Sequence, residues 1–263
     1  MSELHYTLSG DTRRPAILFL HGFMGSAVDW RDVMVGLDEQ FRCLAVDLPG
    51  HGASVGLPRE TYTFERAARA VISALDETGT ERAAFAGYSM GGRLALFIAL
   101  RYPKRCSGLF LESASPGLES KEEREQRRRA DEERALRLDS GDFEEFLNDW
   151  YRQPLFTSLA RDEDRLQRII EARLRSDPKE LARSLRGMGT GSQPSLWEEL
   201  AGLRVPALTV AGELDEKFVE ISHRMAALNA RMRTAVVPGV GHNVRVEAPG
   251  AYLTLLQDIL YSL

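Results

Sequence analysis

A serine between two glycines is the first feature of the chain that could do chemistry. Ser89 is the centre of the segment Gly-Tyr-Ser-Met-Gly at residues 87–91. Glycines two positions before and after a serine permit the sharp turn that exposes its hydroxyl between a strand and a helix. Such a hydroxyl becomes reactive only when a histidine takes its proton and a carboxylate orients that histidine. A chemical role for Ser89 therefore requires both partners elsewhere in the chain.

Two residues downstream meet this requirement. Asp215 follows an apolar run at residues 207–210, and His242 follows another at residues 234–237. Each stands just past the end of an expected strand, where doubly wound sheets carry their functional residues. The chain order serine, acid, histidine is also the order found in the α/β-hydrolase fold. The sequence thus predicts a catalytic triad of Ser89, Asp215 and His242.

Two other carboxylates could take the place of Asp215. Glu112 follows an apolar run at residues 108–111, and Glu213 lies two positions before Asp215. Asp215 is the preferred acid because it stands further into its loop. From there it can reach a histidine at the end of the next strand.

A loop near the N-terminus can supply hydrogen-bond donors for a negatively charged oxygen. Residues 21–25 read His-Gly-Phe-Met-Gly and follow an apolar run. Small residues in such a loop let the backbone approach the reacting centre. We predict that the backbone amides of Phe23 and Met90 form an oxyanion hole, since Met90 opens the helix behind the serine. The turn at residues 47–52 is predicted to be architectural.

Short apolar runs must position these residues. They are expected to be buried parallel strands, because each is brief, aliphatic and followed by a helical pattern. The runs are residues 16–20, 43–46, 83–86, 108–111, 207–210 and 234–237. Apolar residues at spacings of three and four predict crossover helices at residues 64–75, 94–100 and 251–260. This alternation predicts an α/β class protein with a mostly parallel, doubly wound sheet, the α/β-hydrolase fold.

One long stretch interrupts the alternation. Residues 117–197 show no strand pattern, and arginine, glutamate and scattered large apolar residues dominate them. An insertion of this length between two strands is expected to lie across the carboxyl ends of the sheet, where ligands bind. We predict one domain with a core of residues 1–116 and 198–263 and a helical lid of residues 117–197. Such a lid would select the substrate.

Composition narrows the range of partners. The chain has 263 residues and a formal net charge of -5, with charges of both signs spread along it. This balance favours a small-molecule substrate and argues against nucleic acid or an anionic membrane. Cys43 and Cys106 both lie in apolar runs, which suits buried thiols in a reducing compartment. With no signal-peptide pattern and no apolar run of about 18 residues, we expect a cytoplasmic protein, as a monomer or small homo-oligomer.

The motifs together resemble a known family. Residues 21–23, 47–52, 87–93 and 241–243 carry motifs shared by many hydrolases. More selective segments are Ser-Pro-Gly-Leu, Asp-Trp-Tyr-Arg-Gln-Pro-Leu-Phe and Gly-Met-Gly-Thr-Gly-Ser-Gln-Pro, at residues 115–118, 149–156 and 187–194. Across nearly its whole length the chain is similar to the 2-succinyl-6-hydroxy-2,4-cyclohexadiene-1-carboxylate synthases, lyases of menaquinone biosynthesis.

The resemblance implies a reaction. It is the elimination of pyruvate from 2-succinyl-5-enolpyruvyl-6-hydroxy-3-cyclohexene-1-carboxylate, without a cofactor and without a metal. The triad would make Ser89 a general base that removes the ring proton alpha to the succinyl ketone. Ser89 would form no covalent adduct. The developing enolate oxygen would be held by the Phe23 and Met90 amides.

A substrate with several carboxylates requires cationic side chains in its pocket. Arg93 lies one helical turn past the serine, so its side chain can stand near the elbow. The resemblance adds Arg127 and Arg173 as substrate-binding arginines of the lid, Trp150 as its tryptophan and Tyr88 as the elbow tyrosine. The planar guanidinium binds carboxylates through two parallel hydrogen bonds. Neighbouring arginines leave the register of the two lid arginines open by one or two positions.

Two other readings use the same residues. A serine hydrolase of esters or of carbon–carbon bonds would need the same triad and fold. A ligand-sensing protein of this fold would keep the triad and signal through a partner. Arginines matched to a polyanion favour the lyase, because the pocket of a simple esterase is expected to be more apolar.

Overall fold

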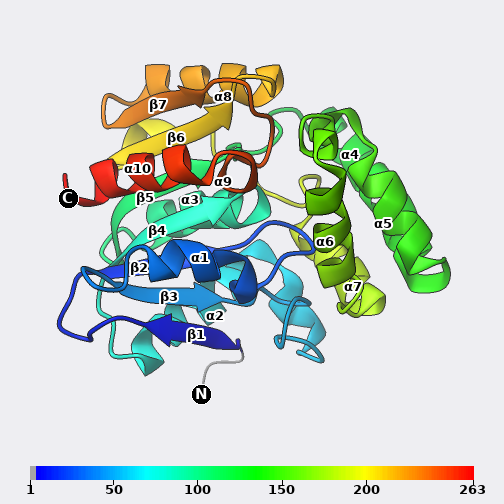
Figure 1. Cartoon of the computed structure of the whole chain (residues 1–263), viewed down its shortest axis with the longest axis horizontal. Helices are drawn as coiled ribbons and strands as arrows, with labels where there is room; N and C mark the ends of the chain where they lie inside the picture. Colours follow the sequence, from blue (N-terminus) through cyan, green and yellow to red (C-terminus); the bar gives the residue numbers. More distant parts are fainter. Residues whose placement is uncertain (1–3) are drawn as a thin grey trace.

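A seven-stranded sheet forms the centre of the molecule. The computed structural model describes residues 4–263, and Figure 1 shows the sheet with its strands side by side. The strand order is β1-β3-β2-β4-β5-β6-β7. The strands are β1 (Tyr6–Ser9), β2 (Ala16–Leu20), β3 (Arg42–Val46), β4 (Ala83–Tyr88), β5 (Cys106–Glu112), β6 (Ala207–Gly212) and β7 (Met232–Val237). Only β1 runs antiparallel to its neighbour among these strands.

The mostly parallel α/β-hydrolase fold predicted from the sequence is confirmed. Each of the six apolar runs lies inside one of the strands β2 to β7. The sequence reasoning missed β1, which pairs along β3 from Tyr6 opposite Val46 to Ser9 opposite Cys43. This edge strand is only partly buried, so it carries no apolar run to reveal it.

Helices cover both faces of the sheet. On one face lie α2 (Phe64–Glu77), α3 (Met90–Arg101) and α8 (Glu216–Leu228), whose apolar side chains share one buried cluster. On the other face lie α1 (Arg31–Val35) and α10 (Pro249–Leu260), which share a second cluster. The helices expected from apolar spacing are α2, α3 and α10; α2 and α3 are crossovers, whereas α10 follows the last strand and connects no two strands. The short helix α9 (Val244–Glu247) precedes α10.

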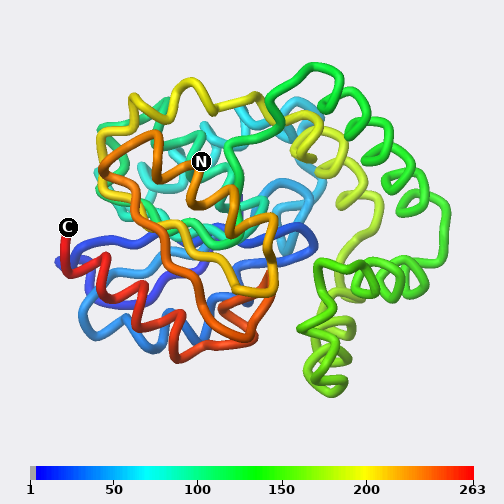
Figure 2. Tube along the Cα trace, turned by 90° about the horizontal axis from the view of Figure 1, so that it is seen from above, coloured from blue at the N-terminus to red at the C-terminus, as the bar shows by residue number. Residues whose placement is uncertain are grey.

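Four helices stand between β5 and β6. They are α4 (Lys121–Ser140), α5 (Phe143–Tyr151), α6 (Glu163–Arg173) and α7 (Pro178–Met188). They lie together beyond one end of the sheet, the end toward which the parallel strands point (Figures 1 and 2). Apolar side chains of all four helices form a third cluster, which also takes in Met24 from the core. Residues 117–197, which contain these four helices, are the proposed lid.

The remaining helices are single turns of 3-10 type. They are η1 (Ala27–Trp30), η2 (Arg59–Tyr62), η3 (Pro154–Phe156), η4 (Leu159–Arg161) and η5 (Leu200–Gly202). Within residues 4–263 no helix combines the length and apolar character that crossing a membrane requires. Cys43 and Cys106 are buried and unpaired, as expected from the apolar runs around them.

Candidate active site

Ser89 occupies a strained turn between β4 and α3. Its backbone has a φ of 48°, in the left-handed region that side chains with a Cβ rarely adopt. The turn packs so tightly on β2 that a Cβ on Gly91 would lie 2.1 Å from the carbonyl oxygen of Leu20. A Cβ on Gly87 would lie 2.6 Å from the backbone of Gly91. Both glycines are therefore required by close approach, and the sharp turn expected at Ser89 is present.

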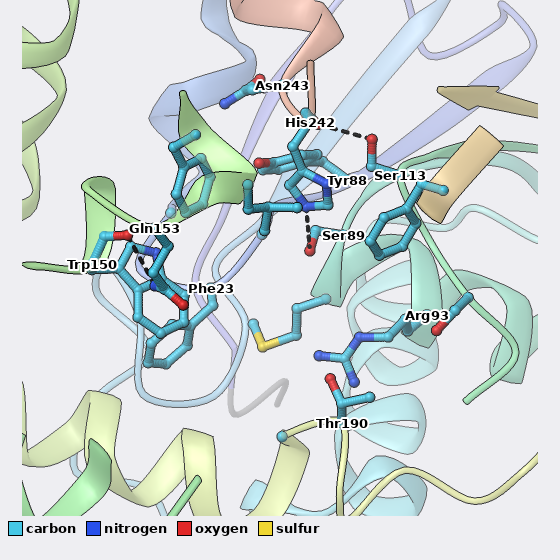
Figure 3. Close-up of a pocket in the computed structure, with 18 of the residues that line it drawn as sticks. Phe23, Tyr88, Ser89, Arg93, Ser113, Trp150, Gln153, Thr190, His242 and Asn243 are labelled. Carbon is cyan, nitrogen blue, oxygen red and sulfur yellow. Dashed lines mark hydrogen bonds between the residues drawn. The ribbon is translucent and has the colours of Figure 1, made fainter. Parts of the chain in front are cut away.

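The three predicted triad residues come together. Nδ1 of His242 lies 2.6 Å from Oδ2 of Asp215, and Nε2 lies 3.4 Å from Oγ of Ser89. A carboxylate only accepts hydrogen bonds, so Nδ1 carries the proton and Nε2 is left to accept one from the serine. Figure 3 shows the imidazole directed at the serine hydroxyl.

The two other carboxylates bind elsewhere. Oε1 of Glu112 accepts a hydrogen bond from the Arg245 backbone N–H at 2.9 Å. Oε2 of Glu213 accepts one from the Gly239 N–H at 2.8 Å. Burial raises the pKa of Glu112 to about 7, although the positive charge of Arg245 opposes the rise. Asp215 is thus the carboxylate that contacts the His242 imidazole.

Two buried histidines shape the loop that carries Phe23. The Leu48 N–H donates to Nε2 of His21 at 2.9 Å, and the Met24 N–H donates to Nε2 of His51 at 3.1 Å. Burial lowers the pKa of both imidazoles, so both are neutral acceptors at pH 7. They join this loop to the turn at residues 47–52. That turn therefore has the architectural role expected of it.

The predicted oxyanion donors face the same space. Phe23 and Met90 both line the cavity that contains Ser89. Neither backbone N–H donates a hydrogen bond to another of residues 4–263. Gly22 leaves room for the Tyr88 ring, since a Cβ there would lie 2.6 Å from it. The two amides are available for a negatively charged oxygen.

A cavity of about 240 Å3 lies between the sheet and the proposed lid. Ser89 and His242 are at its base, and every other predicted site residue except Asp215 lines it. Asp215 stands behind His242, as an orienting acid must. The proposed lid contributes Trp150, whose ring centroid lies 5.3 Å from that of Phe23 (Figure 3). The core and the proposed lid therefore enclose one pocket.

Three aromatic rings surround His242, and the sequence reasoning missed two of them. The ring centroid of Phe218 lies 4.8 Å from that of His242, and the centroid of Phe156 lies 6.0 Å from it. Tyr88 adds a third ring at 5.5 Å. Phe156 belongs to a lid segment that the resemblance had marked, whereas nothing in the sequence around Phe218 pointed to the site. These apolar walls keep water away from the imidazole.

Arg93 is buried and has no carboxylate partner among the described residues. Its Nη1 donates to the Met188 carbonyl at 3.2 Å and to Oε1 of Gln193 at 3.1 Å, both neutral acceptors. Burial, and then the positive charge of Arg127, lower the pKa of Arg93 to about 9. The guanidinium still carries its charge at pH 7. A buried cation without an anion favours the binding of one.

The predicted Arg127 shares one buried acid with an arginine that was not predicted. Nε of Arg127 lies 2.7 Å from Oδ1 of Asp131, and Nη1 of Arg134 lies 3.5 Å from the same oxygen. Burial, and then Arg127, lower the pKa of Arg134. Both arginines line the cavity. One carboxylate thus faces two cations, which leaves positive charge available to a ligand.

Arg173 is held in a full ion pair. Its Nη1 and Nη2 donate to the two carboxylate oxygens of Asp29 at 2.8 and 2.7 Å. Burial alone would lower the pKa of Arg173, but the Asp29 carboxylate raises it. This pair joins α6 of the proposed lid to η1 of the core. The predicted Arg173 therefore lines the cavity with its charge already neutralised.

Three further residues at the site were not predicted individually. Lys217, Gln153 and Thr190 line the cavity, the first from α8 and the other two from lid segments of the resemblance. Asp29 and Asp131 were also missed, because only their ion pairs with arginines in the structure identify them as residues of the site. Among residues 4–263, no cluster of three or more His, Cys, Asp or Glu side chains could hold a metal ion.

Comparisons with known proteins point in one direction. Residues 15–249 match the family model described as the alpha/beta hydrolase fold. A protein of Bacillus subtilis (strain 168), provisionally named 2-succinyl-6-hydroxy-2,4-cyclohexadiene-1-carboxylate synthase, is 38% identical over 97% of this chain and 93% of its own length. The synthase of the same name from Serratia proteamaculans (strain 568) is 34% identical over 95% of each chain.

Solved structures agree. The structure of MenH from S. aureus is 33% identical, covers 98% of both chains and superposes with a TM-score of 0.93. The enol-lactonase from Burkholderia xenovorans LB400 superposes with a TM-score of 0.84 at 23% identity, which shows a shared fold only.

Proposed function

The chain belongs to the 2-succinyl-6-hydroxy-2,4-cyclohexadiene-1-carboxylate synthase family of the α/β-hydrolase fold, and from this membership we propose that Ser89, His242 and Asp215 carry out pyruvate elimination. The family acts in menaquinone biosynthesis. Its substrate is 2-succinyl-5-enolpyruvyl-6-hydroxy-3-cyclohexene-1-carboxylate. The product is the 2,4-cyclohexadiene, and pyruvate leaves.

The reaction begins with a proton transfer. Ser89 Oγ removes the ring proton at the carbon that bears the succinyl group, while its own proton passes to Nε2 of His242. Asp215 stabilises the resulting imidazolium across the 2.6 Å contact with Nδ1. The ketone next to that carbon accepts the electron pair as an enolate. A general base of this kind forms no bond to the substrate.

The enolate oxygen and the leaving group complete the step. Phe23 and Met90 amides stabilise the developing negative charge. As the ketone re-forms, electrons move through the ring double bond and break the bond to the enolpyruvate oxygen. The proton that Ser89 passed to His242 is then delivered to the enolpyruvate carbon, so that pyruvate leaves, His242 is neutral again and Ser89 keeps the ring proton as its hydroxyl hydrogen. The balance is one proton taken from the ring and one delivered to the leaving group, with no cofactor required.

The observation that carries this proposal is the charge of the cavity. Five cationic side chains line it, whereas Asp29 is the only acid among its described lining residues; the cations are Arg93, Arg127, Arg134, Arg173 and Lys217. The substrate brings three carboxylates, on the ring, the succinyl chain and the enolpyruvyl group. Arg93 has no carboxylate partner, and Arg127 and Arg134 share only one. Their remaining positive charge suits the binding of such a polyanion. An esterase pocket has no comparable need for them.

The test is pyruvate release from the enolpyruvyl substrate, generated in place by the preceding enzyme of the pathway. Intact-mass measurement of the protein during turnover accompanies it. Steady pyruvate formation with no added mass on the protein supports a general base. A stable mass increase located at Ser89 would instead show a nucleophile, and a sensor would bind the substrate without releasing pyruvate. In the same assay Arg127→Gln tests a cavity arginine, and Arg129→Gln, an exposed neighbour on α4, is its control.

A further inference from the structure

The catalytic histidine has to cross two strands to reach the serine. The sheet order places β5 and β6 between β4, which ends at the elbow, and β7, which precedes His242. A loop that simply followed β7 would leave the imidazole beyond the end of β7. Something must therefore hold the loop across the ends of β6 and β5. The contacts along residues 238–245 show what does so.

The loop first passes over the end of β6. A Cβ on Gly212 would lie 2.2 Å from the carbonyl oxygen of Gly241 and 2.4 Å from that of Val240. The Leu214 N–H donates to the same Val240 oxygen at 2.9 Å. Only a glycine at the end of β6 permits this approach. The backbone just before His242 is thus seated directly on that strand.

The loop then meets the end of β5. Ser113 follows β5 with a φ of 47°, one of three positive values among the described residues other than glycine. Its N–H donates to the Val210 carbonyl of β6 at 2.9 Å, and its Oγ donates to the His242 carbonyl at 2.8 Å (Figure 3). The side chain is 1% exposed, so water does not compete for this bond. The strained turn directs the hydroxyl at the histidine.

The residue before Ser113 makes two further contacts. The Glu112 carbonyl accepts a hydrogen bond from the Ser89 N–H at 2.8 Å. Its carboxylate accepts one from the Arg245 N–H at 2.9 Å. The two residues at the end of β5 therefore contact the backbone of the nucleophile on one side and the histidine loop on the other.

We propose that Ser113 is a positioning residue of this enzyme, whose hydroxyl holds His242 over Ser89. The proposal rests on the triad assigned above. The contact it controls is sensitive, because the 3.4 Å between Nε2 of His242 and Oγ of Ser89 is already at the long end for a hydrogen bond. A small displacement of the loop breaks it. Loss of this hydroxyl therefore slows the proton transfer and leaves substrate binding intact.

Two substitutions distinguish the contribution of the Ser113 hydroxyl from that of the strained backbone turn. Ser113→Ala removes the hydroxyl and keeps the strained backbone. Ser113→Gly also removes the hydroxyl but relieves the strain, since glycine adopts positive φ freely. We expect both to lower kcat about 10-fold, in keeping with a displacement of under 1 Å, and to leave KM within about 2-fold. A residue needed only for the turn would leave Ser113→Gly fully active.

Thr209→Val is the matched control. Thr209 is buried on β6, and its hydroxyl donates to the Arg233 carbonyl of β7 at 3.2 Å. Its loss removes a comparable hydrogen bond to the β7 segment without touching the histidine loop. We expect its kcat to equal that of the parent. Any general effect of losing a buried hydroxyl is therefore measured separately.

A second readout does not depend on the reaction. The Nδ1 proton of His242, held against Asp215, is expected as a downfield proton NMR signal that His242→Gln abolishes. Weakening or broadening of this signal in both Ser113 variants, with the fall in kcat and no change in Thr209→Val, supports the proposal. A Ser113→Gly variant that matches Thr209→Val in both kcat and signal overturns it. If the parent releases no pyruvate, the proposed function fails, and the signal alone decides the role of Ser113.

Discussion

The substitution Arg93→Met tests whether Arg93 binds the substrate or stabilises the fold. Arg93 donates two hydrogen bonds to neutral acceptors, each of about 1.5 to 3 kcal/mol for a charged donor. Burial and the positive charge of Arg127 oppose this gain, because together they lower the pKa of Arg93 from 12.5 to about 9, a shift of about 5 kcal/mol against the charged form. The two contributions nearly cancel. In the absence of substrate we therefore expect Arg93→Met to change Tm by less than about 5 °C.

In substrate binding, no opposing contribution offsets the loss of the Arg93 guanidinium. Removing one partner of a buried ion pair costs about 3 kcal/mol, which is about 100-fold in affinity. We expect KM for the enolpyruvyl substrate to rise by about that factor in Arg93→Met. Thermal unfolding and pyruvate-release kinetics on the same preparation measure both quantities.

Arg101→Met is the control for Arg93→Met. Arg101 ends the same helix, and its guanidinium binds Glu199 at the surface. Exposed pairs contribute about 0 to 1 kcal/mol, so neither Tm nor KM should change much. A KM for Arg93→Met within about 2-fold of the parent would refute the carboxylate role. A fall in Tm of more than about 10 °C would show that Arg93 serves the fold instead.

Three further predictions concern the triad, the buried acid and the lid. Ser89→Ala should lower the rate of pyruvate formation by about 1,000-fold or more, and a near-normal rate would remove Ser89 from the mechanism. Glu112→Gln should stabilise the protein by about 3 kcal/mol at pH 8 and by under about 1 kcal/mol at pH 5. Burial raises the pKa of Glu112 from 4.5 to about 7, so its contribution is present below pH 4.5 and is lost as the pH rises through 7; equal urea midpoints for variant and parent at pH 8 would contradict this. Arg127→Gln should raise KM about 10-fold or more while Arg129→Gln leaves it unchanged, and equal effects would show a general charge effect of α4.

The parts of the fold that could be predicted are those with local signals. Strands β2 to β7 each contain a short apolar run, and in β2 to β6 these runs are almost entirely buried because helices cover both faces of the sheet. The edge strand β1 is half exposed and has no such run. Chain order and placement after strands were enough to bring Ser89, Asp215 and His242 together.

Contacts between distant segments could not be predicted. Arg173 and Asp29 are 144 residues apart, and nothing near either residue indicates the other. Ser113 and His242 are 129 residues apart, and their hydrogen bond depends on a positive φ that a serine rarely adopts. Glu112 and Asp215 also had the same local context, after a strand. Only the path of the loop over β6 decides which of them meets the histidine.

The central claim is elimination of pyruvate by a triad of the hydrolase type. It is tested most directly by measuring pyruvate release and nitrophenyl-ester cleavage on one sample of the protein. The account predicts fast pyruvate release and feeble ester cleavage, since the cavity is built for a polyanion. Rapid ester cleavage with no pyruvate release would contradict it and identify the triad as that of a hydrolase.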